Sequence, residues 1–440
     1  MALKKRLPLK NIVLFVNNVS AVTAANIKNF GKQNNQKLKI AVIRDIKRRK
    51  ITPTLEKIDI LINCDFNKPL KTAVALKPYQ DNFLAITARG ETNVQAMAKI
   101  IPNVPYLKTP TSQSLEWATD KICMRERLRM FDKTISPNFA IVDNCAQESI
   151  LKIKKQVGFP LVLKPASLAG SLLVSICYYE EELEQSLKKI FRKIKKVYKD
   201  NKRDIKPKVL VEQFMEGEMY SIDVYVTARG KVYYCPLVHV KTGRSIGFDD
   251  FFGYQRITPT LLKNGSIKSA RLVAQKAVHA LGLRSTTVHI ELMRDDENGW
   301  KVIELGPRIG GWRHKMYELS HGINHSLNDV LIRMPLPPQI PNKRKGYSAV
   351  YQFFATQEGV LTDLKGIKKI KKLSSYIKID VNKKIGDICD FAKHGGKSVC
   401  DVILFNKNRS VLMADARKIE KALIITTARS SRSANSKKAL

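Results

Sequence analysis

Two short strand-like runs in the middle of the chain each carry one glutamate, and an acidic turn joins them. Residues 286–293 read Thr-Thr-Val-His-Ile-Glu-Leu-Met, and residues 301–308 read Lys-Val-Ile-Glu-Leu-Gly-Pro-Arg. The connecting stretch 295–299, Asp-Asp-Glu-Asn-Gly, favours a hairpin. The pattern therefore predicts antiparallel neighbouring strands that bring Glu291 and Glu304 into one cleft.

The alternation of side chains indicates what this cleft can bind. The first run alternates apolar residues with His289 and Glu291, and in the second we expect Glu304 to share a face with Val302, opposite Ile303. Taken singly, each glutamate could be a solvated residue on a sheet face. Together they suit a hard cation such as Mg²⁺, which prefers carboxylate oxygens and keeps phosphates as its remaining ligands. The pair therefore predicts a metal-bridged phosphate site.

Length and composition predict a globular, intracellular type of protein. A chain of 440 residues with 44% hydrophobic residues can form about two to four domains. Its seven cysteines include no Cys-x-x-Cys pair, which argues against a zinc site or a disulfide framework and favours a cytoplasmic location. The apolar run 12–16 is too short for a signal peptide or a membrane span, so we interpret it as the first strand.

The formal net charge of +39 implies attraction to polyanions. Much of this charge is lysine around the helix expected over 181–199, on the face opposite its apolar stripe. No RNA-binding or helix-turn-helix signature accompanies it, so a generally lysine-rich composition explains the charge better than dedicated nucleic-acid binding. Any contact with nucleic acid is expected to be unspecific. The tail 426–440, rich in Ser, Arg, Lys and Ala, is expected to be disordered.

The N-terminal part, 1–108, is predicted to be a parallel α/β domain. Strand-like and helix-like stretches alternate there, without a Gly-x-Gly-x-x-Gly after the first strand, which argues against a dinucleotide site. A proline-rich linker, 101–110, precedes one helix expected over 114–130. The strands are expected at 12–16, 38–43, 58–63 and 83–87, and the helices at 21–33 and 91–101.

The remainder is predicted to be α+β. We divide it into a core over 109–340, a small and separate β-rich cap over 345–425 with four or five short strands, and the basic tail. The core strands are expected at 161–165, 172–178, 209–214, 219–227 and 231–240.

Two further motifs in the core suit a nucleotide. Lys164 ends an apolar strand, and the small-residue loop 166–171 follows, so its ammonium group and the loop N–H groups can meet phosphate oxygens. Further on, Glu212 lies at a strand end and Glu218 follows a glycine turn. Their carboxylates could accept from an adenine amino group or from ribose hydroxyls, although a polar hairpin is the alternative.

Taken in order, these motifs closely resemble the ATP-grasp superfamily. The set comprises Asp120-Lys121, Lys164-Pro165 with Gly170-Ser171, residues 212–218, Glu291, and Glu304 to Arg308 with Gly310-Gly311. The plan of an α/β domain, an ATP-grasp core of two α+β subdomains and a C-terminal cap is similar to biotin carboxylase-like members. The His-x-Glu and Arg-x-Gly-Gly stretches are most similar to carboxylate-amine ligases of the L-amino-acid ligase and carnosine synthase type.

The resemblance implies a role for each motif. Arg308 would stabilise the transferred phosphoryl group or the later oxyanion, and Gly306 stands where many relatives have an asparagine as a third metal ligand. The phosphate loop also has a single glycine. The implied nucleotide-binding residues are Lys121, Lys164, Ser167, Gly170, Ser171, Glu212, the backbone of Gln213 and Phe214, and Glu218; the implied metal ligands are Glu291 and Glu304.

We therefore expect an ATP-dependent ligase that activates a carboxylate as an acyl phosphate and couples it to an amine, releasing ADP and phosphate. The expected cofactors are ATP and Mg²⁺, or Mn²⁺ in its place. The expected partners are small-molecule carboxylates and amines. No membrane association is expected, and the chain could form a homo-oligomer. The alternatives are a biotin carboxylase-like activation of bicarbonate, or a basic nucleic-acid-associated protein with a vestigial nucleotide site. The loop 241–256 or Trp312 to His314 could line the acceptor pocket or serve packing, and His289 could contact substrate or be structural.

Overall fold

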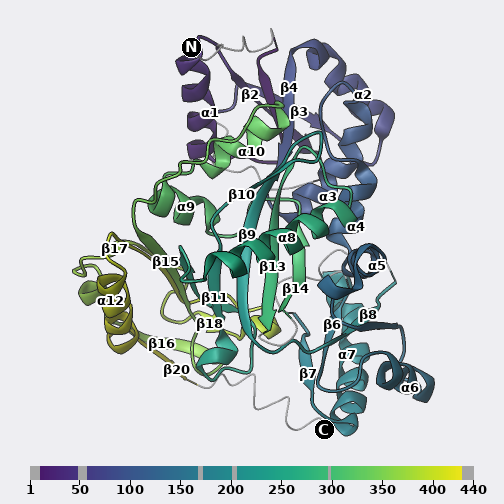
Figure 1. Ribbon diagram of the computed structural model, residues 1–440, viewed down its shortest axis with the longest axis vertical. Helices are drawn as coiled ribbons and strands as arrows, with labels where there is room; N and C mark the ends of the chain where they lie inside the picture. The colour runs from purple at the N-terminus through teal and green to yellow at the C-terminus, as the bar shows by residue number, and fades with distance from the viewer. Residues whose placement is uncertain (1–9, 48–56, 167–171, 201–205, 296–298, 429–440) are drawn as a thin grey trace.

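The computed structural model describes residues 10–47, 57–166, 172–200, 206–295 and 299–428. These residues form four β-sheets with helices packed around them (Figure 1). No helix in these ranges is both long and apolar enough to cross a bilayer.

The N-terminal sheet is parallel, as the sequence predicts, and its strands lie in the order β3-β2-β1-β4. Alternate residues of β1 face opposite sides: Val13 and Phe15 pack with α1 and α10, and Leu14 and Val16 pack with α2 and α3. The sheet is therefore covered on both faces. The bounds are β1 (Ile12–Val16), α1 (Ala21–Gln33), β2 (Lys39–Asp45), β3 (Ile60–Cys64), α2 (Pro69–Leu76), β4 (Phe83–Ala88), α3 (Glu91–Ile100) and α10 (His325–Arg333).

Two helices, α4 (Ser112–Thr119) and α5 (Lys121–Phe131), stand where one was predicted. Asp120 separates them because its carboxylate accepts hydrogen bonds from the backbone N–H groups of Ile122 and Cys123, at 2.8 and 3.0 Å. This is an N-cap, and it starts a new helix axis. The prediction of a continuous helix was therefore wrong at this residue. Because Asp120 caps α5, Lys121 is the first residue of that helix.

The second sheet is antiparallel, with strand order β5-β8-β6-β7. Helices α6 and α7 pack against it through a common apolar cluster, while the lysines of α7 point outward, as predicted. The bounds are β5 (Phe139–Val142), α6 (Gln147–Gln156), β6 (Leu161–Pro165), β7 (Ser175–Cys177), α7 (Glu180–Asp200) and β8 (Val209–Gln213).

The longest sheet runs in the order β14-β13-β9-β11-β12-β15-β19-β17, with β10 paired to β9. Helix α8 packs beside β13 and β14, and α9 lies near β15 (Figure 1). The bounds are β9 (Glu218–Val226), β10 (Val232–Tyr234), β11 (Val238–Thr242), β12 (Gly253–Thr258), α8 (Asn264–Ala280), β13 (Thr286–Asp295), β14 (Gly299–Gly306), α9 (Arg313–His321), β15 (Tyr347–Phe353), β17 (Tyr376–Val381) and β19 (Cys400–Asn406).

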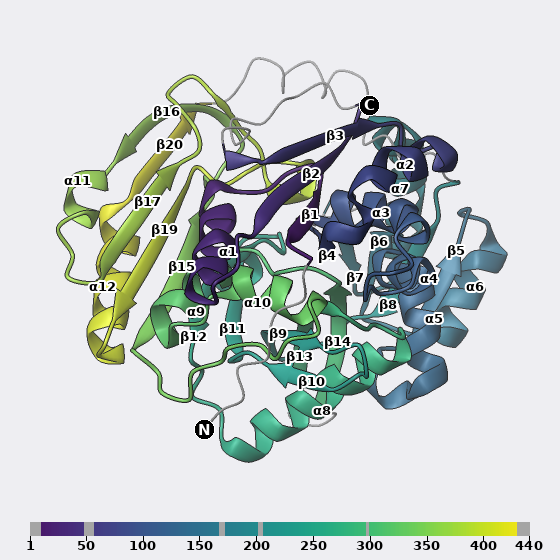
Figure 2. The ribbon, with the colours of Figure 1, turned by 90° about the horizontal axis from the view of Figure 1, so that it is seen from above.

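The C-terminal part continues this sheet instead of forming the separate cap that was expected. Strand β15 pairs with β12 of the core from Ser348 to Tyr351, and it also pairs with β19. Viewed from above, these strands and α12 lie on the side of the molecule away from α5 and α6 (Figure 2). The other elements are β16 (Gly359–Lys365), α11 (Ile367–Ile370), β18 (Ile388–Cys389), α12 (Arg409–Ala422) and β20 (Ile424–Ala428), whose last residues belong to the tail predicted to be disordered; 429–440 lie outside the described residues.

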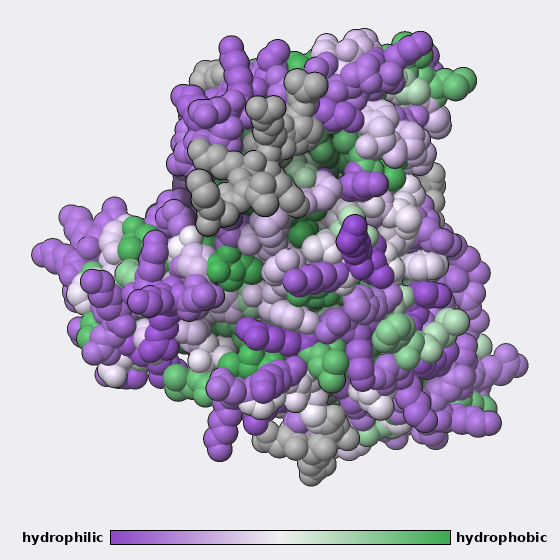
Figure 3. Space-filling view, turned by 45° about the horizontal axis from the view of Figure 1, so that its top comes forward, coloured by the Kyte–Doolittle hydropathy of each residue, from purple (hydrophilic) through white to green (hydrophobic). Residues whose placement is uncertain are grey.

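Hydrophilic residues dominate the face shown in the space-filling view, with hydrophobic residues in small separate groups (Figure 3). The lysines of α7, which contribute to the charge of +39, are exposed, as the sequence indicates.

Candidate functional site

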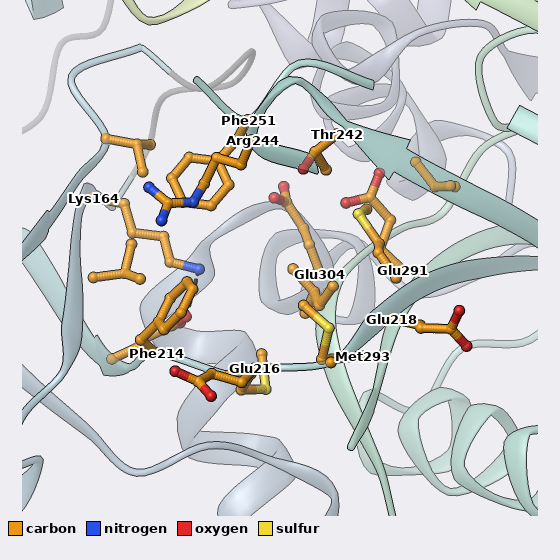
Figure 4. Close-up of a pocket in the computed structure, with 18 of the residues that line it drawn as sticks. Lys164, Phe214, Glu216, Glu218, Thr242, Arg244, Phe251, Glu291, Met293 and Glu304 are labelled. Carbon is orange, nitrogen blue, oxygen red and sulfur yellow. Dashed lines mark ion pairs between the residues drawn. The ribbon is translucent and has the colours of Figure 1, made fainter. Parts of the chain in front are cut away.

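A cavity of about 620 Å³ lies between the β5-β8-β6-β7 sheet and strands of the longest sheet. In Figure 4, Lys164 and Phe214 lie on one side of it and Glu291 and Glu304 on the other. The structure thus brings together motifs that are far apart in sequence. The lining includes these residues singled out from the sequence: Lys121, Lys164, Glu212, Gln213, Phe214, Glu218, Glu291 and Glu304.

The two predicted metal-binding carboxylates lie on paired strands. Strands β13 and β14 are antiparallel, and the Cα atoms of Glu291 and Glu304 are direct partners in the ladder. Burial alone would raise the pKa of Glu291, but His289, Arg313 and Arg308 outweigh it and lower that pKa to about 2. Glu291 is therefore ionised at neutral pH, as a metal ligand must be.

A β-bulge in β14 corrects the predicted arrangement of faces. The register shifts after Glu291, so that Leu292 pairs with Val302 and Ile303 is the additional residue. As a result Val302 is buried in the core, while Ile303 and Glu304 both line the cavity. The expectation that Val302 would share a face with Glu304 was wrong, because the bulge breaks the two-residue period between them.

Lys121 contacts the second of these carboxylates. Its Nζ lies 3.1 Å from Oε1 of Glu304. Burial lowers the pKa of Lys121, but Glu304 and Glu91 outweigh this effect and the net pKa is raised. The ammonium group is therefore charged at the edge of the cavity, where it can meet an anion.

Lys164 belongs to a buried ion-pair cluster. Its Nζ pairs with Oε2 of Glu212, whose Oε1 lies 2.6 Å from Nε of Arg125. Burial would raise the pKa of Glu212, but Arg125 and Lys164 lower it to about 2. Because both carboxylate oxygens of Glu212 face cations, this residue holds Lys164 in place rather than offering a free acceptor to adenine.

Arg125 is the site residue that sequence reasoning missed. Its side chain is fully buried, and the signal for it was its position one helical turn after Lys121, which puts both on one face of α5.

The backbone N–H groups predicted to hold adenine are already used. Gln213 N donates to Asn138 O at 2.9 Å, and Phe214 N donates to Pro160 O at 3.0 Å. These two residues can therefore meet a base through their carbonyl groups and side chains only.

Glu218 begins β9 at the cavity edge, with its side chain 54% exposed. Tyr220 donates its hydroxyl to Oε2 of Glu218 at 2.7 Å, and Nη1 of Arg294 lies 3.6 Å from the same oxygen. The carboxylate thus keeps accessible surface, and the residue borders the cavity, which suits the predicted contact with ribose hydroxyls.

His289 links Glu291 to a buried network. Its Nδ1 lies 2.7 Å from Oδ1 of Asp223, and its Nε2 lies 3.5 Å from Oε1 of Glu291. Asp223 also accepts from Nε2 of His325 at 2.7 Å and from the backbone N–H of Gly310 at 2.9 Å. The structural interpretation of His289 is therefore favoured, with the histidine orienting a predicted metal ligand.

Arg308 points toward the N-terminal domain. Its Nη2 lies 3.8 Å from Oε2 of Glu91 at the start of α3, and Nη1 donates to Ile309 O at 3.2 Å. In the described part of the chain it does not line the 620 Å³ cavity. The phosphoryl group or oxyanion that Arg308 is proposed to stabilise would therefore approach it from the side of the N-terminal sheet.

The phosphate-loop residues Ser167, Gly170 and Ser171 lie outside the described residues.

The loop 241–256 borders the same cavity. The guanidinium carbon of Arg244 lies 5.7 Å from the ring centroids of both Phe214 and Phe251, and Nη2 donates to Tyr178 Oη at 2.9 Å. Arg313, from the second candidate segment, is buried and donates to Ser221 Oγ at 2.6 Å. The first segment therefore lines the cavity, and Arg313 serves packing.

The carboxylates beside the cavity determine which metal ion the site can hold. No three His, Cys, Asp or Glu side chains gather as a complete protein cage within the described ranges. Gly306, at the end of β14, offers no side-chain donor. Two facing carboxylates fit an ion such as Mg²⁺ that takes its other ligands from phosphates and water.

A family model described as the ATP-grasp domain matches residues 157–316. Among curated proteins, the alanine–anticapsin ligase of Bacillus amyloliquefaciens is 28% identical over 320 residues, which cover 69% of this chain and 64% of the relative. The alanine–anticapsin ligase of Bacillus subtilis strain 168 has the same identity and coverage. The chain thus spans less than two thirds of the length of these relatives.

Solved structures show the same fold at lower identity. An L-amino acid ligase from Bacillus licheniformis superposes with a TM-score of 0.78 at 18% identity, covering 97% of this chain and all of that one. An ADP complex of an N5-carboxyaminoimidazole ribonucleotide synthetase gives 0.69 at 14% identity, covering 94% and 98%. A biotin carboxylase from Campylobacter jejuni gives 0.63 at 14% identity, covering 95% and 92%.

Proposed function

We propose that this chain, whose residues 157–316 match the ATP-grasp domain model, is a ligase that uses ATP to join a carboxylate to an amine. One observation carries the proposal: Glu291 and Glu304 are paired across two strands and share a cavity with Lys121 and Lys164. Paired carboxylates facing lysines are what a metal-bound triphosphate requires.

The proposed reaction has two steps. A substrate carboxylate oxygen attacks the γ-phosphorus of ATP, and the bond to the ADP oxygen breaks. The nitrogen of an amine then attacks the acyl carbon, the carbon–oxygen bond to phosphate breaks, and the amine loses a proton. Lys164 and Lys121 would hold the phosphates, and Arg308 would stabilise the charge that develops on the transferred group or on the tetrahedral intermediate.

Glu291 and Glu304 would hold Mg²⁺, or Mn²⁺ in its place. When bound, such an ion neutralises the triphosphate and draws charge from the transferring phosphoryl group. Glu291 stays ionised because His289, Arg313 and Arg308 lower its pKa, and the ammonium group of Lys121 lies 3.1 Å from Glu304.

We further propose that the substrates are amino acids. The curated relatives are named alanine–anticapsin ligases, and a structural neighbour is titled an L-amino acid ligase. Loop 241–256 supplies aromatic and cationic side chains at the cavity edge, including Phe251 and Arg244, that could meet the substrate or the nucleotide. The reaction would take place in the cytoplasm, in keeping with seven free cysteines.

The domain division is also part of this proposal: 1–108 as the N-terminal domain, 109–340 as the ATP-grasp core, and 345–425 as a C-terminal extension of the core sheet. The core would move little relative to that extension because β12 and β15 are hydrogen-bonded.

The test is ADP release measured against a matrix of amino acids, small carboxylic acids and amines, with bicarbonate as a separate arm. ADP release that requires one amino acid as donor and a second as acceptor would support the proposal. ADP release that depends on bicarbonate would favour a carboxylase, and no ATP binding with steeply salt-dependent RNA binding would favour the nucleic-acid alternative.

A further inference from the structure

Arg125 makes more contacts than neutralising Glu212 requires. Its Nε and Nη2 lie 2.6 and 3.3 Å from the two oxygens of Glu212. Its Nη1 donates to Val302 O at 2.8 Å, and Nη2 also donates to Ile303 O. A single buried guanidinium from α5 thus joins a side chain of β8 to the main chain of β14.

The two carbonyl groups are available to Arg125 because of the β-bulge. In a regular strand, consecutive carbonyl groups point to opposite edges, so one side chain could not donate hydrogen bonds to both. Both the Val302 and the Ile303 carbonyls accept from Arg125 and therefore point toward the same side of β14, which the bulge at Ile303 makes possible. Within the described chain, β14 is the terminal strand of its sheet, so this edge faces α5.

The bulge also determines where Glu304 lies. With Ile303 as the additional residue, Glu304 becomes the direct partner of Glu291. Without it, the residue opposite Glu291 would be Ile303, and the two carboxylates would be out of register.

Arg125 is also related to both lysines of the site, to Lys121 through helix α5 and to Lys164 through their shared partner Glu212. Lys121, one turn earlier on α5, lies 3.1 Å from Glu304, and Glu212 pairs with Lys164. Helix α5 and its arginine therefore lie between the half of the cavity that carries Lys164 and the half that carries the paired carboxylates.

We propose that Arg125 is a positioning residue that stabilises the bulge in β14 and so couples the metal-binding pair, Glu291 and Glu304, to the phosphate-binding Lys164. The inference rests on the proposed binding of metal–ATP. Its distinctive consequence is that Arg125 governs how strongly a divalent ion increases nucleotide affinity.

Lysine at this position separates positioning from charge. Arg125→Lys keeps a cation beside Glu212, but a single ammonium group cannot bridge a carboxylate and two carbonyls in the planar geometry of a guanidinium. Arg129→Lys is the matched control, because Arg129 is on the same helix but exposed. Calorimetry would measure ATP affinity of each variant with EDTA and with saturating Mg²⁺, and a Mg²⁺ titration of ADP release would follow.

For Arg125→Lys, we expect ATP affinity in EDTA to stay within about threefold of the parent. The Mg²⁺ concentration for half-maximal ADP release should rise about 10- to 100-fold, as when partners that orient metal ligands are removed. In the metal-free protein, amide hydrogen exchange should become faster in β14 and stay unchanged in β1 to β4. Arg129→Lys should match the parent throughout.

Each outcome distinguishes the two proposals. An unchanged Mg²⁺ requirement in a folded Arg125→Lys protein would overturn the positioning role and leave the proposed function intact. A parent whose ATP affinity does not respond to Mg²⁺ would overturn both. If Arg125→Lys does not fold, Arg125→Gln is the second variant, because Glu212 then keeps Lys164 as its charged partner and no buried charge is left unpaired; the same shift in Mg²⁺ requirement is expected.

Discussion

Glu291 and Glu304 face each other across a strand pair in which one of the two strands is bulged. Each side chain has a different cationic neighbour, with His289 Nε2 at 3.5 Å from Glu291 and Lys121 Nζ at 3.1 Å from Glu304. The two carboxylates are therefore distinguishable by mutation, although they lie in one cleft.

Glu304→Gln should abolish acyl-phosphate formation. An amide lacks the charge that holds Mg²⁺ on the transferring phosphate, while the ammonium group of Lys121 is still present at the cavity to meet ATP. We expect ADP release to fall by at least about 100-fold with ATP affinity in EDTA unchanged or increased. Glu126→Gln, an exposed change on α5, is the control. Near-normal ADP release by Glu304→Gln would remove Glu304 from the metal site.

Lys164→Ala should weaken ATP binding with or without Mg²⁺, because the ammonium group is lost from the phosphate end of the cavity. Glu212 would keep Arg125 as its partner, so the protein should still fold. We expect an increase in the dissociation constant of about 10-fold or more. Calorimetry beside Lys155→Ala, an exposed lysine of the neighbouring α6, would check this, and a variant that binds ATP like the parent would refute the assignment.

Arg308→Ala should leave ATP affinity within a few-fold while lowering turnover by about two to three orders of magnitude, since its charge matters most in the transition state. The structure supplies a second variant. Glu91→Gln removes the partner 3.8 Å from Arg308 and should change turnover far less. Equal losses in both variants would mean that Arg308 is a structural link between α3 and the core.

The ion pair between Asp132 and Lys276 should make stability depend on acid pH. The hydrogen bond from Lys276 to Asp132 is the main cause that lowers the pKa of Asp132 from 3.8 to about 2. A lowered carboxylate pKa stabilises the fold above pH 3.8, and this contribution is lost as the pH falls toward 2.

Asp132→Asn keeps an oxygen to accept from Thr134 N but removes the charge. It should cost about 1 kcal/mol of unfolding free energy at pH 7, and less as the pH approaches 2. Urea denaturation at several pH values would measure this. Asp143→Asn, whose partner Lys206 is 74% exposed, should cost less and is the control.

Nucleic acid should bind weakly and without sequence preference, with dissociation constants of about 10⁻⁴ to 10⁻⁶ M at physiological salt. The reason is that the lysines of α7 are spread over an exposed helix face without a groove-reading element. Fluorescence anisotropy with two unrelated RNA sequences over a salt series would check it. Sub-nanomolar, sequence-selective binding would favour the alternative function instead.

Local sequence signals predicted the elements that local forces determine. The bounds of β1 and β6 match the expected ranges, because apolar runs with clear ends specify buried strands. The cap at Asp120 was readable from its residue type but was overlooked.

Features that depend on distant contacts were not predicted. The bulge at Ile303 is stabilised by Arg125, which lies 178 residues earlier in the chain. The residues that neighbour Ile303 in sequence therefore do not indicate the bulge. The partner of Arg308 is likewise far away in the sequence, on α3. Many residues that line the cavity could be singled out from the sequence, whereas the ion pairs and hydrogen bonds between them became apparent only in the folded structure.

The pairing of β12 with β15 determines which fragments of this chain can be made. A fragment that ends at residue 340 would keep β12 but lose its neighbour, exposing four backbone positions from Gln255 to Thr258 along a strand edge. It would also uncover the aromatic side chains of Phe252 and Tyr254, which pack against the C-terminal part. An exposed apolar strand edge promotes aggregation. The chain segment that carries the nucleotide motifs is therefore not a portable module, and its chemistry should be studied in the intact protein.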